Sequence, residues 1–109
     1  GARVAVRKMH EKGISSIFVV DKSSHLRGLL TIDDAIKAIR ENRWAEEYLT
    51  HDYHTTSPDT PLHELIGIGT ETKYPIAVVE DGKLLGIIVR VSLLAGLVLG
   101  KEGEEEADE

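Results

Sequence analysis

The stretch Gly28-Leu29-Leu30-Thr31-Ile32-Asp33-Asp34 decides the fold. Its apolar run ends in a Thr-x-x-Asp step, and an amphipathic helical pattern follows over residues 32–40. Two short apolar runs, residues 17–21 and 26–30, are separated by a polar turn. Short β-branched or leucine-rich runs bounded by turn residues are typical of strands. The region therefore predicts strand, turn, strand, helix.

The same order of elements recurs later in the chain. The second copy consists, in order, of Ile76-Ala77-Val78-Val79-Glu80, the turn Asp81-Gly82-Lys83, residues 84–89 and an apolar helix from Ser92. Gly28 of the first copy corresponds to Gly86 of the second. Internal similarity at a fixed period is the signature of a duplicated structural unit, so the sequence predicts two related repeats.

Composition and charge limit the class of protein. The chain has 109 residues, of which 41% are hydrophobic and only 5% aromatic, so we expect one compact unit with an aliphatic core. It contains no cysteine and no apolar run long enough to span a bilayer. It begins Gly-Ala-Arg without an initiator methionine, which indicates a fragment of a longer protein.

The net charge of −6 is unevenly distributed. Residues 1–50 carry nine Lys/Arg against seven Asp/Glu, whereas residues 101–109 carry one Lys against six acidic residues. A nucleic-acid-binding protein needs a continuous basic surface, so this distribution argues against one.

Local patterns predict the elements of the first repeat. Four apolar residues recur at helical spacing before Gly13: Ala2, Ala5, Val6 and Met9. Glycine is favoured just beyond a helix, so we expect this helix to end there. In the helix over residues 32–40 we expect Ile32, Ala35, Ile36 and Ile39 to point inward.

The connector and the second repeat are less regular. Trp44, Tyr48 and Leu49 predict a short helix that packs between the repeats. Thr60 and Pro61 predict the N-cap and the first residue of another helix.

Near its C-terminal end the chain carries further structural signals. Asp81-Gly82 predicts a two-residue hairpin turn. The last helix, expected over Ser92–Leu99, is apolar almost all round and should be covered on several sides, with Gly100 ending it.

These elements predict an α/β (α+β) fold of two βαββα-type repeats packed about a pseudo-twofold axis. The repeats are expected over residues 2–41, without a leading strand, and residues 54–100, with a connector over 42–53. Residues 101–109 form an acidic run that cannot bury apolar surface and is expected to be disordered.

This order, with Gly28-x-x-Thr31-x-x-Asp34 after the second hairpin strand, resembles the CBS domain, which occurs in tandem pairs called Bateman modules. The likeness covers roughly residues 2–99. Residues 2–9, 13–21 and 31–36 more narrowly resemble the C-terminal CBS pair of the ATP-binding subunit of glycine betaine/proline (quaternary amine) ABC importers. The acidic tail also matches some members of that family.

The resemblance implies a ligand site. CBS domains hold adenosyl ligands with the residues just before the first hairpin strand and with the Ser/Thr-x-x-Asp step, whose Asp binds the ribose hydroxyls. Carried over, the ligand-binding residues of this chain are Ile14, Ser15, Ser16, Thr31 and Asp34. The second copy has Val89 and Ser92 in place of the Thr and the Asp, so the resemblance implies at most one equipped half-site.

Simpler interpretations stand beside these. Thr31 and Asp34 can form a capping box, with the Thr oxygen on the N3 amide and the Asp reaching back, and capping with or without ligand contact stays open. His51-Asp52-Tyr53-His54 has too few placed ligands to favour a metal site over a solvated loop. Because no Gly-x-x-x-x-Gly-Lys-Ser/Thr motif occurs, the chain is not itself expected to be an ATPase. No nucleophile–base pair occurs near a predicted strand end, so another enzyme is not expected either.

The functional hypothesis is a regulatory CBS pair that gates an osmoprotectant importer in response to an adenine nucleotide, a cyclic dinucleotide or ionic strength, with no required cofactor. The expected partners are a second copy, bound through the CBS helices, the ATPase and membrane subunits of the transporter, and an anionic membrane surface, but no nucleic acid. The expected location is cytoplasmic, at the inner face of the cell membrane. The alternatives are a passive dimerisation scaffold, a CBS module of another cytoplasmic protein, and, least favoured, an enzyme.

Overall fold

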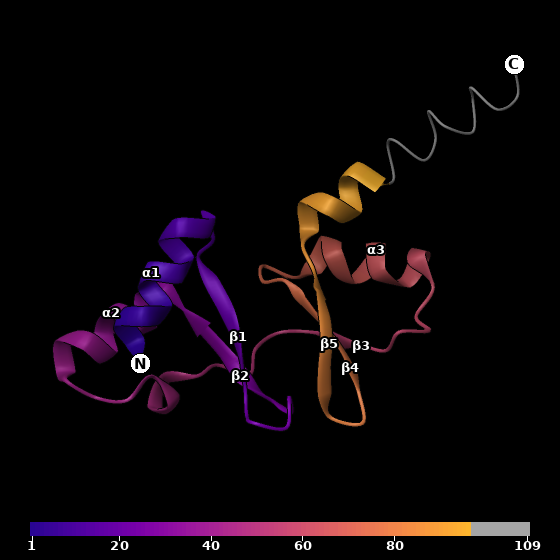
Figure 1. Ribbon diagram of the computed structural model, residues 1–109. Helices are drawn as coiled ribbons and strands as arrows, with labels where there is room; N and C mark the ends of the chain where they lie inside the picture. Colours follow the sequence, from indigo (N-terminus) through magenta and orange to yellow (C-terminus); the bar gives the residue numbers. More distant parts are fainter. Residues whose placement is uncertain (97–109) are drawn as a thin grey trace, which may run out of the picture. The chain divides into compact units, whose positions relative to one another are not determined.

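The computed structural model describes residues 1–96. The expected end of the last helix, Gly100 and the acidic run 101–109 lie outside the described residues. The chain forms two compact units rather than the one expected from its length: the first contains Gly1–Asp52 with Asp81–Leu84, and the second contains the remainder (Figure 1).

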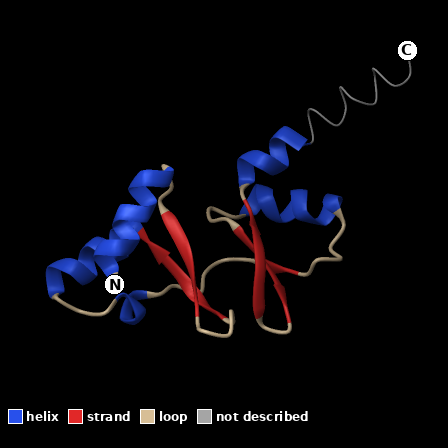
Figure 2. Ribbon diagram, in the orientation of Figure 1, coloured by secondary structure: helices blue, strands red, loops and turns tan. Residues whose placement is uncertain are grey.

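The first unit contains two helices, a hairpin and a short 3₁₀ helix. In chain order these are α1 (Ala2–Lys12), β1 (Ser16–Val20), β2 (Leu26–Thr31), α2 (Ile32–Glu41) and η1 (Ala45–Tyr48), as Figure 2 shows by colour. The predicted end of α1 at Gly13 is confirmed, because this residue has a φ of 64° and its amide donates to the His10 carbonyl. Glycine adopts this left-handed conformation without the steric cost of a side chain.

The predicted first hairpin is confirmed: β1 and β2 pair antiparallel. The Asp21 carboxylate accepts hydrogen bonds from the backbone amides of Ser23 and His25, each at 2.9 Å, and so holds the turn. The His25 bond in particular lowers the pKa of Asp21. The carboxylate therefore stabilises the turn above its ordinary pKa, and this stabilisation is lost as the pH falls through the lowered value.

The core of this unit is built largely from alanine. Met9 and Leu30 are fully buried with Ala35 and Ala38, and the remaining buried members are Ala2, Ala5 and Ala45. Small side chains allow α1 and α2 to pack closely. The inward position of Ala35 is confirmed. Ala38 is also fully buried, whereas Ile32, Ile36 and Ile39 are only half-buried.

The prediction for the connector is wrong at Trp44, whose side chain is 74% exposed. The connector contains η1, with Ala45 buried and Tyr48 partly buried against the core. A 3₁₀ helix has three residues per turn, so Ala45 and Tyr48 share one face. Trp44 is the residue before η1, and the α-helical spacing that would place it over Tyr48 does not apply.

The second unit contains β3 (Thr55–Thr56), α3 (Leu62–Glu71), β4 (Ile76–Glu80), most of β5 (Lys83–Ile88) and a helical segment at residues 90–96. The first two residues of β5 belong to the first unit. Its sheet has the order β3-β4-β5, with β3 parallel to β4. Within the described residues the sheet of the first unit has two strands, β1 and β2, whereas the sheet of the second unit also has the leading strand β3. The predicted turn is also confirmed, since Asp81 and Gly82 both have positive φ values of 52° and 77°.

Two helix starts differ from their predictions. α3 begins at Leu62 with Pro61 as its N-cap, because the Thr60 hydroxyl bonds to Thr56 and to the Ser57 amide instead of capping the helix. The last helix begins at Arg90 rather than Ser92, because the Val89 carbonyl already accepts bonds from the amides of Ser92 and Leu93.

The equivalent glycines of the two repeats give a stability test. A Cβ atom on Gly28 would lie 2.9 Å from Leu49 Cβ and 3.2 Å from the Thr50 carbonyl oxygen, whereas one on Gly86 would meet nothing within 4 Å. We expect Gly28→Ala to lower the free energy of unfolding by about 1–3 kcal/mol through overpacking. Gly86→Ala should stay within about 0.5 kcal/mol of the parent. Urea unfolding measures both, and equal effects would contradict the close packing at Gly28.

Candidate functional site

The five predicted site residues meet at one end of the β1–β2 ladder. Ser16 lies opposite Thr31 in the strand register. The Ile32 amide donates to the Ser15 carbonyl at 2.9 Å, and the Ile14 amide donates to the Met9 carbonyl at the same distance. The junction between α1 and β1 thus lies beside the junction between β2 and α2.

The side chains at this junction differ in exposure. Ile14 is 41% exposed and Ser15 is exposed, whereas Ser16, Thr31 and Asp34 are half-buried. The junction therefore carries one apolar side chain, three hydroxyls and one carboxylate, and each of these residues is at least partly accessible to solvent.

Thr31 begins α2. Its backbone is extended, with φ −86° and ψ 157°, and its hydroxyl oxygen accepts a hydrogen bond from the Asp34 amide at 3.2 Å. This is one half of the predicted capping box. In the other half, the Asp34 carboxylate would accept a hydrogen bond from the Thr31 amide. Within residues 1–96 this bond is absent, and the carboxylate has neither a hydrogen-bond nor an ion-pair partner. The fold uses Thr31 and leaves the Asp34 carboxylate available to a ligand.

Asp34 also borders a shallow depression of about 490 Å³ on the surface of α2. The other residues that line it are Asp33, Ile36, Lys37, Arg40 and Glu41. The depression brings two cations, Lys37 and Arg40, to the same side of α2 as the Asp34 carboxylate. A polar ligand held at Asp34 could therefore extend its anionic groups along the helix.

The equivalent junction in the second repeat lacks these groups. Val89 precedes the helical residues 90–96 and offers no side-chain oxygen to the helix start. The carboxylate position is occupied by Ser92. As the sequence predicts, the pairing of a cap hydroxyl with a carboxylate occurs at α2 and not at this second junction.

The histidines of the connector do not converge with acidic side chains. His51 Nε2 lies 3.0 Å from the Arg27 carbonyl oxygen, which gives this ring a structural contact. In the described part of the chain, no group of three or more His, Cys, Asp or Glu side chains could hold a metal ion.

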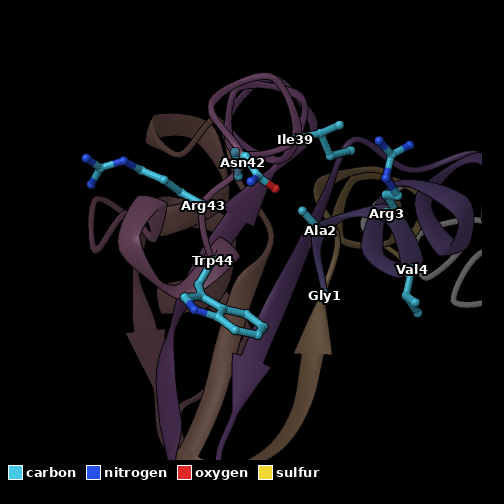
Figure 3. A pocket seen from close by; sticks show the side chains of 9 residues that line it. Gly1, Ala2, Arg3, Val4, Ile39, Asn42, Arg43 and Trp44 are labelled. Atoms are coloured by element: carbon cyan, nitrogen blue, oxygen red, sulfur yellow. The ribbon is translucent and has the colours of Figure 1, made fainter.

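Sequence reasoning missed a second depression, of about 240 Å³, at the opposite end of α2 (Figure 3). It is lined by Gly1, Ala2, Arg3, Val4, Ala38, Ile39, Asn42, Arg43 and Trp44. Because the sequence predicts that Trp44 packs in the connector, it gives no reason to expect a depression beside it. No local signal in the sequence shows that this indole stays exposed.

Comparisons with known proteins identify the duplicated unit. The family model of the CBS domain matches residues 2–41 and 45–98. The glycine betaine/carnitine transport ATP-binding protein of Listeria monocytogenes is 46% identical over 98 residues, which is 89% of this chain and 25% of that protein. The glycine betaine transport ATP-binding protein of Bacillus subtilis is 35% identical over 103 residues, so this chain spans about a quarter of the length of each of these two relatives.

Solved structures agree with the family match. OpuCA of Staphylococcus aureus superposes with a TM-score of 0.80 at 28% identity, covering 89% of this chain and 84% of that one. The CBS domain pair of protein MJ0100, in complex with 5′-methylthioadenosine and S-adenosyl-L-methionine, has a TM-score of 0.68 at 26% identity, covering 92% of this chain and 82% of that one.

The Thr31 cap can be tested separately from any ligand. Thr31→Ala removes the acceptor of the Asp34 amide, so we expect it to lower the free energy of unfolding by about 0.5–2 kcal/mol. Val89→Ser adds a side-chain acceptor at the equivalent helix start and should raise stability by about 0.5–1 kcal/mol. Thermal or urea unfolding measures both changes. A neutral Thr31→Ala would show that the bond seen at 3.2 Å does not support α2.

Proposed function

This chain belongs to the CBS domain family, and from that premise we propose that it is the regulatory CBS pair of the ATP-binding subunit of a glycine betaine/proline-type ABC importer. The likeness to the Listeria protein and to OpuCA supports this assignment. The chain has no phosphate-binding Gly-x-x-x-x-Gly-Lys-Ser/Thr motif, so ATP hydrolysis belongs to another part of such a subunit. The module would gate transport, with the ATPase and membrane subunits as its partners.

The proposed signal is an adenine nucleotide or a cyclic dinucleotide bound where β2 meets α2. The carboxylate of Asp34, which has no partner in the described residues, carries this proposal. A carboxylate accepts hydrogen bonds from both hydroxyls of a ribose, and the exposed Ser15 and Ile14 would contact the rest of the ligand. The two ligands of the MJ0100 structure both contain an adenosyl group, which supports this class.

Ligand binding should depend on Asp34 and not on its neighbour. A hydrogen bond to a charged group contributes about 1.5–3 kcal/mol, so we expect Asp34→Ala to weaken binding tenfold or more. Asp33→Ala is the matched control, because it removes the other first-turn carboxylate of α2 and leaves Asp34 in place. Calorimetry against AMP and against a cyclic dinucleotide measures the difference.

The same titration separates regulation from a passive scaffold. Binding that survives Asp34→Ala, or that depends instead on Ser92, would refute the site. Absence of binding by the parent chain would favour the scaffold. Exposed apolar side chains on the last helix, Val91 at 71% and Leu94 at 44%, support a second copy as partner in either case.

The basic residues of the first unit support ionic strength as a second regulatory signal. Seven exposed cations lie on α1 and α2 or directly after them: Arg3, Arg7, Lys8, Lys12, Lys37, Arg40 and Arg43. Of these, Arg43 is paired with Glu47 at 3.2 Å. In the described part of the chain no helix is long and apolar enough to cross a membrane. The proposed location is the inner face of the cell membrane, where anionic lipids attract such residues.

Membrane attachment should fall as salt rises. The Debye length shrinks from about 10 Å at 0.1 M salt to about 3 Å at 1 M, so exposed Lys/Arg contacts with lipid weaken. We expect the chain to co-sediment with anionic vesicles at low salt, to dissociate at high salt, and to ignore zwitterionic vesicles. Deletion of residues 102–109 removes acidic side chains that compete for the cations and should move dissociation to higher salt. Binding that is absent, or that is insensitive to salt and to this deletion, would contradict the membrane proposal. It would show that the seven cations and the acidic residues of 102–109 are only solvated.

A further inference from the structure

The tips of the two hairpins pair with each other within the first unit. Residues Asp81–Leu84, which contain the turn between β4 and β5 and the first two residues of β5, belong to this unit. His25, which directly precedes β2, forms an antiparallel β-bridge with Lys83. We call the paired residues the hairpin clasp, which consists of Ser24, His25, Leu26, Gly82, Lys83 and Leu84.

Two backbone hydrogen bonds close the hairpin clasp. The Leu26 amide donates to the Gly82 carbonyl at 3.0 Å, and the Leu84 amide donates to the Ser24 carbonyl at 2.9 Å. The bonds thus flank the bridged residues instead of joining them directly, which is the pattern of a non-hydrogen-bonded antiparallel pair. In such a pair the facing Cα atoms are about 4.5 Å apart, so their side chains lie close together.

The hairpin clasp joins equivalent positions of the two repeats. His25 lies three residues before Gly28, and Lys83 lies three residues before Gly86, the corresponding glycine of the second repeat. The two hydrogen bonds are equivalent in the same way, because in each the residue after the bridge donates to the residue before the bridge on the other tip. Both bonds use backbone groups alone, so the clasp needs no specialised side chain.

Each tip is a closed turn on its own. In the first tip, the Asp21 carboxylate accepts hydrogen bonds from the Ser23 and His25 amides. In the second tip, Asp81 and Gly82 adopt positive φ values that close the turn. The clasp therefore joins two preformed turns, and neither turn has to unfold when the clasp opens.

The hairpin clasp is more exposed than the neighbouring contact of β2 with the connector. Leu29 exchanges two hydrogen bonds with Thr50, at 3.0 and 2.9 Å, and its side chain is fully buried. Of the six clasp residues, four are exposed and two, Leu26 and Leu84, are half-buried. Exposed backbone hydrogen bonds with few buried apolar neighbours open at a lower free energy than those of the core.

We propose that the hairpin clasp opens reversibly as a unit while the rest of the first unit stays folded. Opening breaks both backbone bonds together, because each turn moves as one piece. Closure attaches the hairpin tip of the second repeat to the unit that carries the proposed site at Asp34, so the clasp couples the repeats when closed and releases them when open. This regulatory meaning rests on the proposed function, whereas the opening itself does not.

Amide hydrogen exchange, followed by NMR on the whole chain, measures the opening. The Leu26 and Leu84 amides should exchange with the same opening equilibrium constant, because one event exposes both. The Leu29 and Thr50 amides should have an opening constant that is smaller by about tenfold or more.

A substitution at Asp21 tests the role of the first tip. Asp21→Ala removes the acceptor that shapes this turn, so it should raise the opening constant of Leu26 and Leu84 about fivefold and leave that of Leu29 unchanged. Asp33→Ala is the matched control, because it removes another exposed carboxylate of the first unit that lies outside the clasp.

A disulfide should lock the hairpin clasp. The Cα separation of the bridged pair lies within the range that a disulfide spans, and the chain contains no cysteine that could compete. We expect His25→Cys with Lys83→Cys to form an intramolecular disulfide that slows exchange of the Leu26 and Leu84 amides about tenfold or more relative to the reduced form. Asp33→Cys with Lys83→Cys should form none, because the six residues of β2, about 20 Å, separate residue 33 from residue 25.

Several outcomes would overturn the inference. Leu26 and Leu84 amides that exchange as slowly as Leu29, or with different opening constants, would show that the clasp does not open as a separate unit. Faster exchange of Leu29 in Asp21→Ala, or failure of the His25/Lys83 cysteine pair to form its disulfide, would do the same. Asp34→Ala should leave the opening constants of the clasp unchanged, so failure of the proposed ligand site is distinguished from failure of this inference.

Discussion

The close contact between α1 and α2 over Met9 and Leu30 is the constraint on which the first unit depends. Both helices present alanines to this contact, and Ala35 and Ala38 have no exposed surface. Alanine has the highest helix propensity and the smallest apolar side chain that a helix can bury, so the helices approach closely without strain. Their approach fixes both ends of α2. At one end Thr31 and Asp34 meet Ser15 and Ser16, and at the other the chain turns through Asn42 into Trp44.

The two repeats share a plan but distribute their chemistry unequally. Both contain a hairpin that leads into a helix, and Gly28 and Gly86 occupy the same position in it. In the first repeat the helix begins with a threonine cap and an available carboxylate, whereas in the second it begins after Val89 with neither. The turn of the first hairpin is stabilised by hydrogen bonds to the Asp21 side chain. In the second hairpin, Asp81 and Gly82 adopt the positive φ values that a tight turn requires. The two copies thus share a backbone plan, whereas the pairing of a cap hydroxyl with a carboxylate occurs at the start of α2 and not after Val89.

Regulation by such a module requires that a ligand or an ionic condition changes the free energy of one arrangement relative to another. Under the proposed function, the first unit offers two surfaces of different chemistry: a carboxylate at the start of α2 and cations along α1 and α2. The carboxylate suits a ribose and the cations suit an anionic surface. Because the cations are exposed, their interactions are sensitive to salt, whereas hydrogen bonds at the half-buried Asp34 are less so. One small unit could therefore respond to a solute and to ionic strength separately.

The sequence alone determined the features that local chemistry controls. Short apolar runs located the strands, and helical apolar spacing located the helices. Gly13 and Asp81-Gly82 marked a helix end and a turn, and Thr31 and Asp34 marked the start of α2. Tertiary structure decided what depends on packing partners distant in the chain. Ala38 and Ala45 are buried because small side chains fit where α1, α2 and η1 meet, which no hydropathy pattern indicates. Trp44 is exposed because η1 is a 3₁₀ helix that turns Ala45 and Tyr48 inward instead. The depression beside Trp44 is lined by residues 1–4 and by residues within 38–44, which are distant in the sequence. Only the fold brings these two segments together.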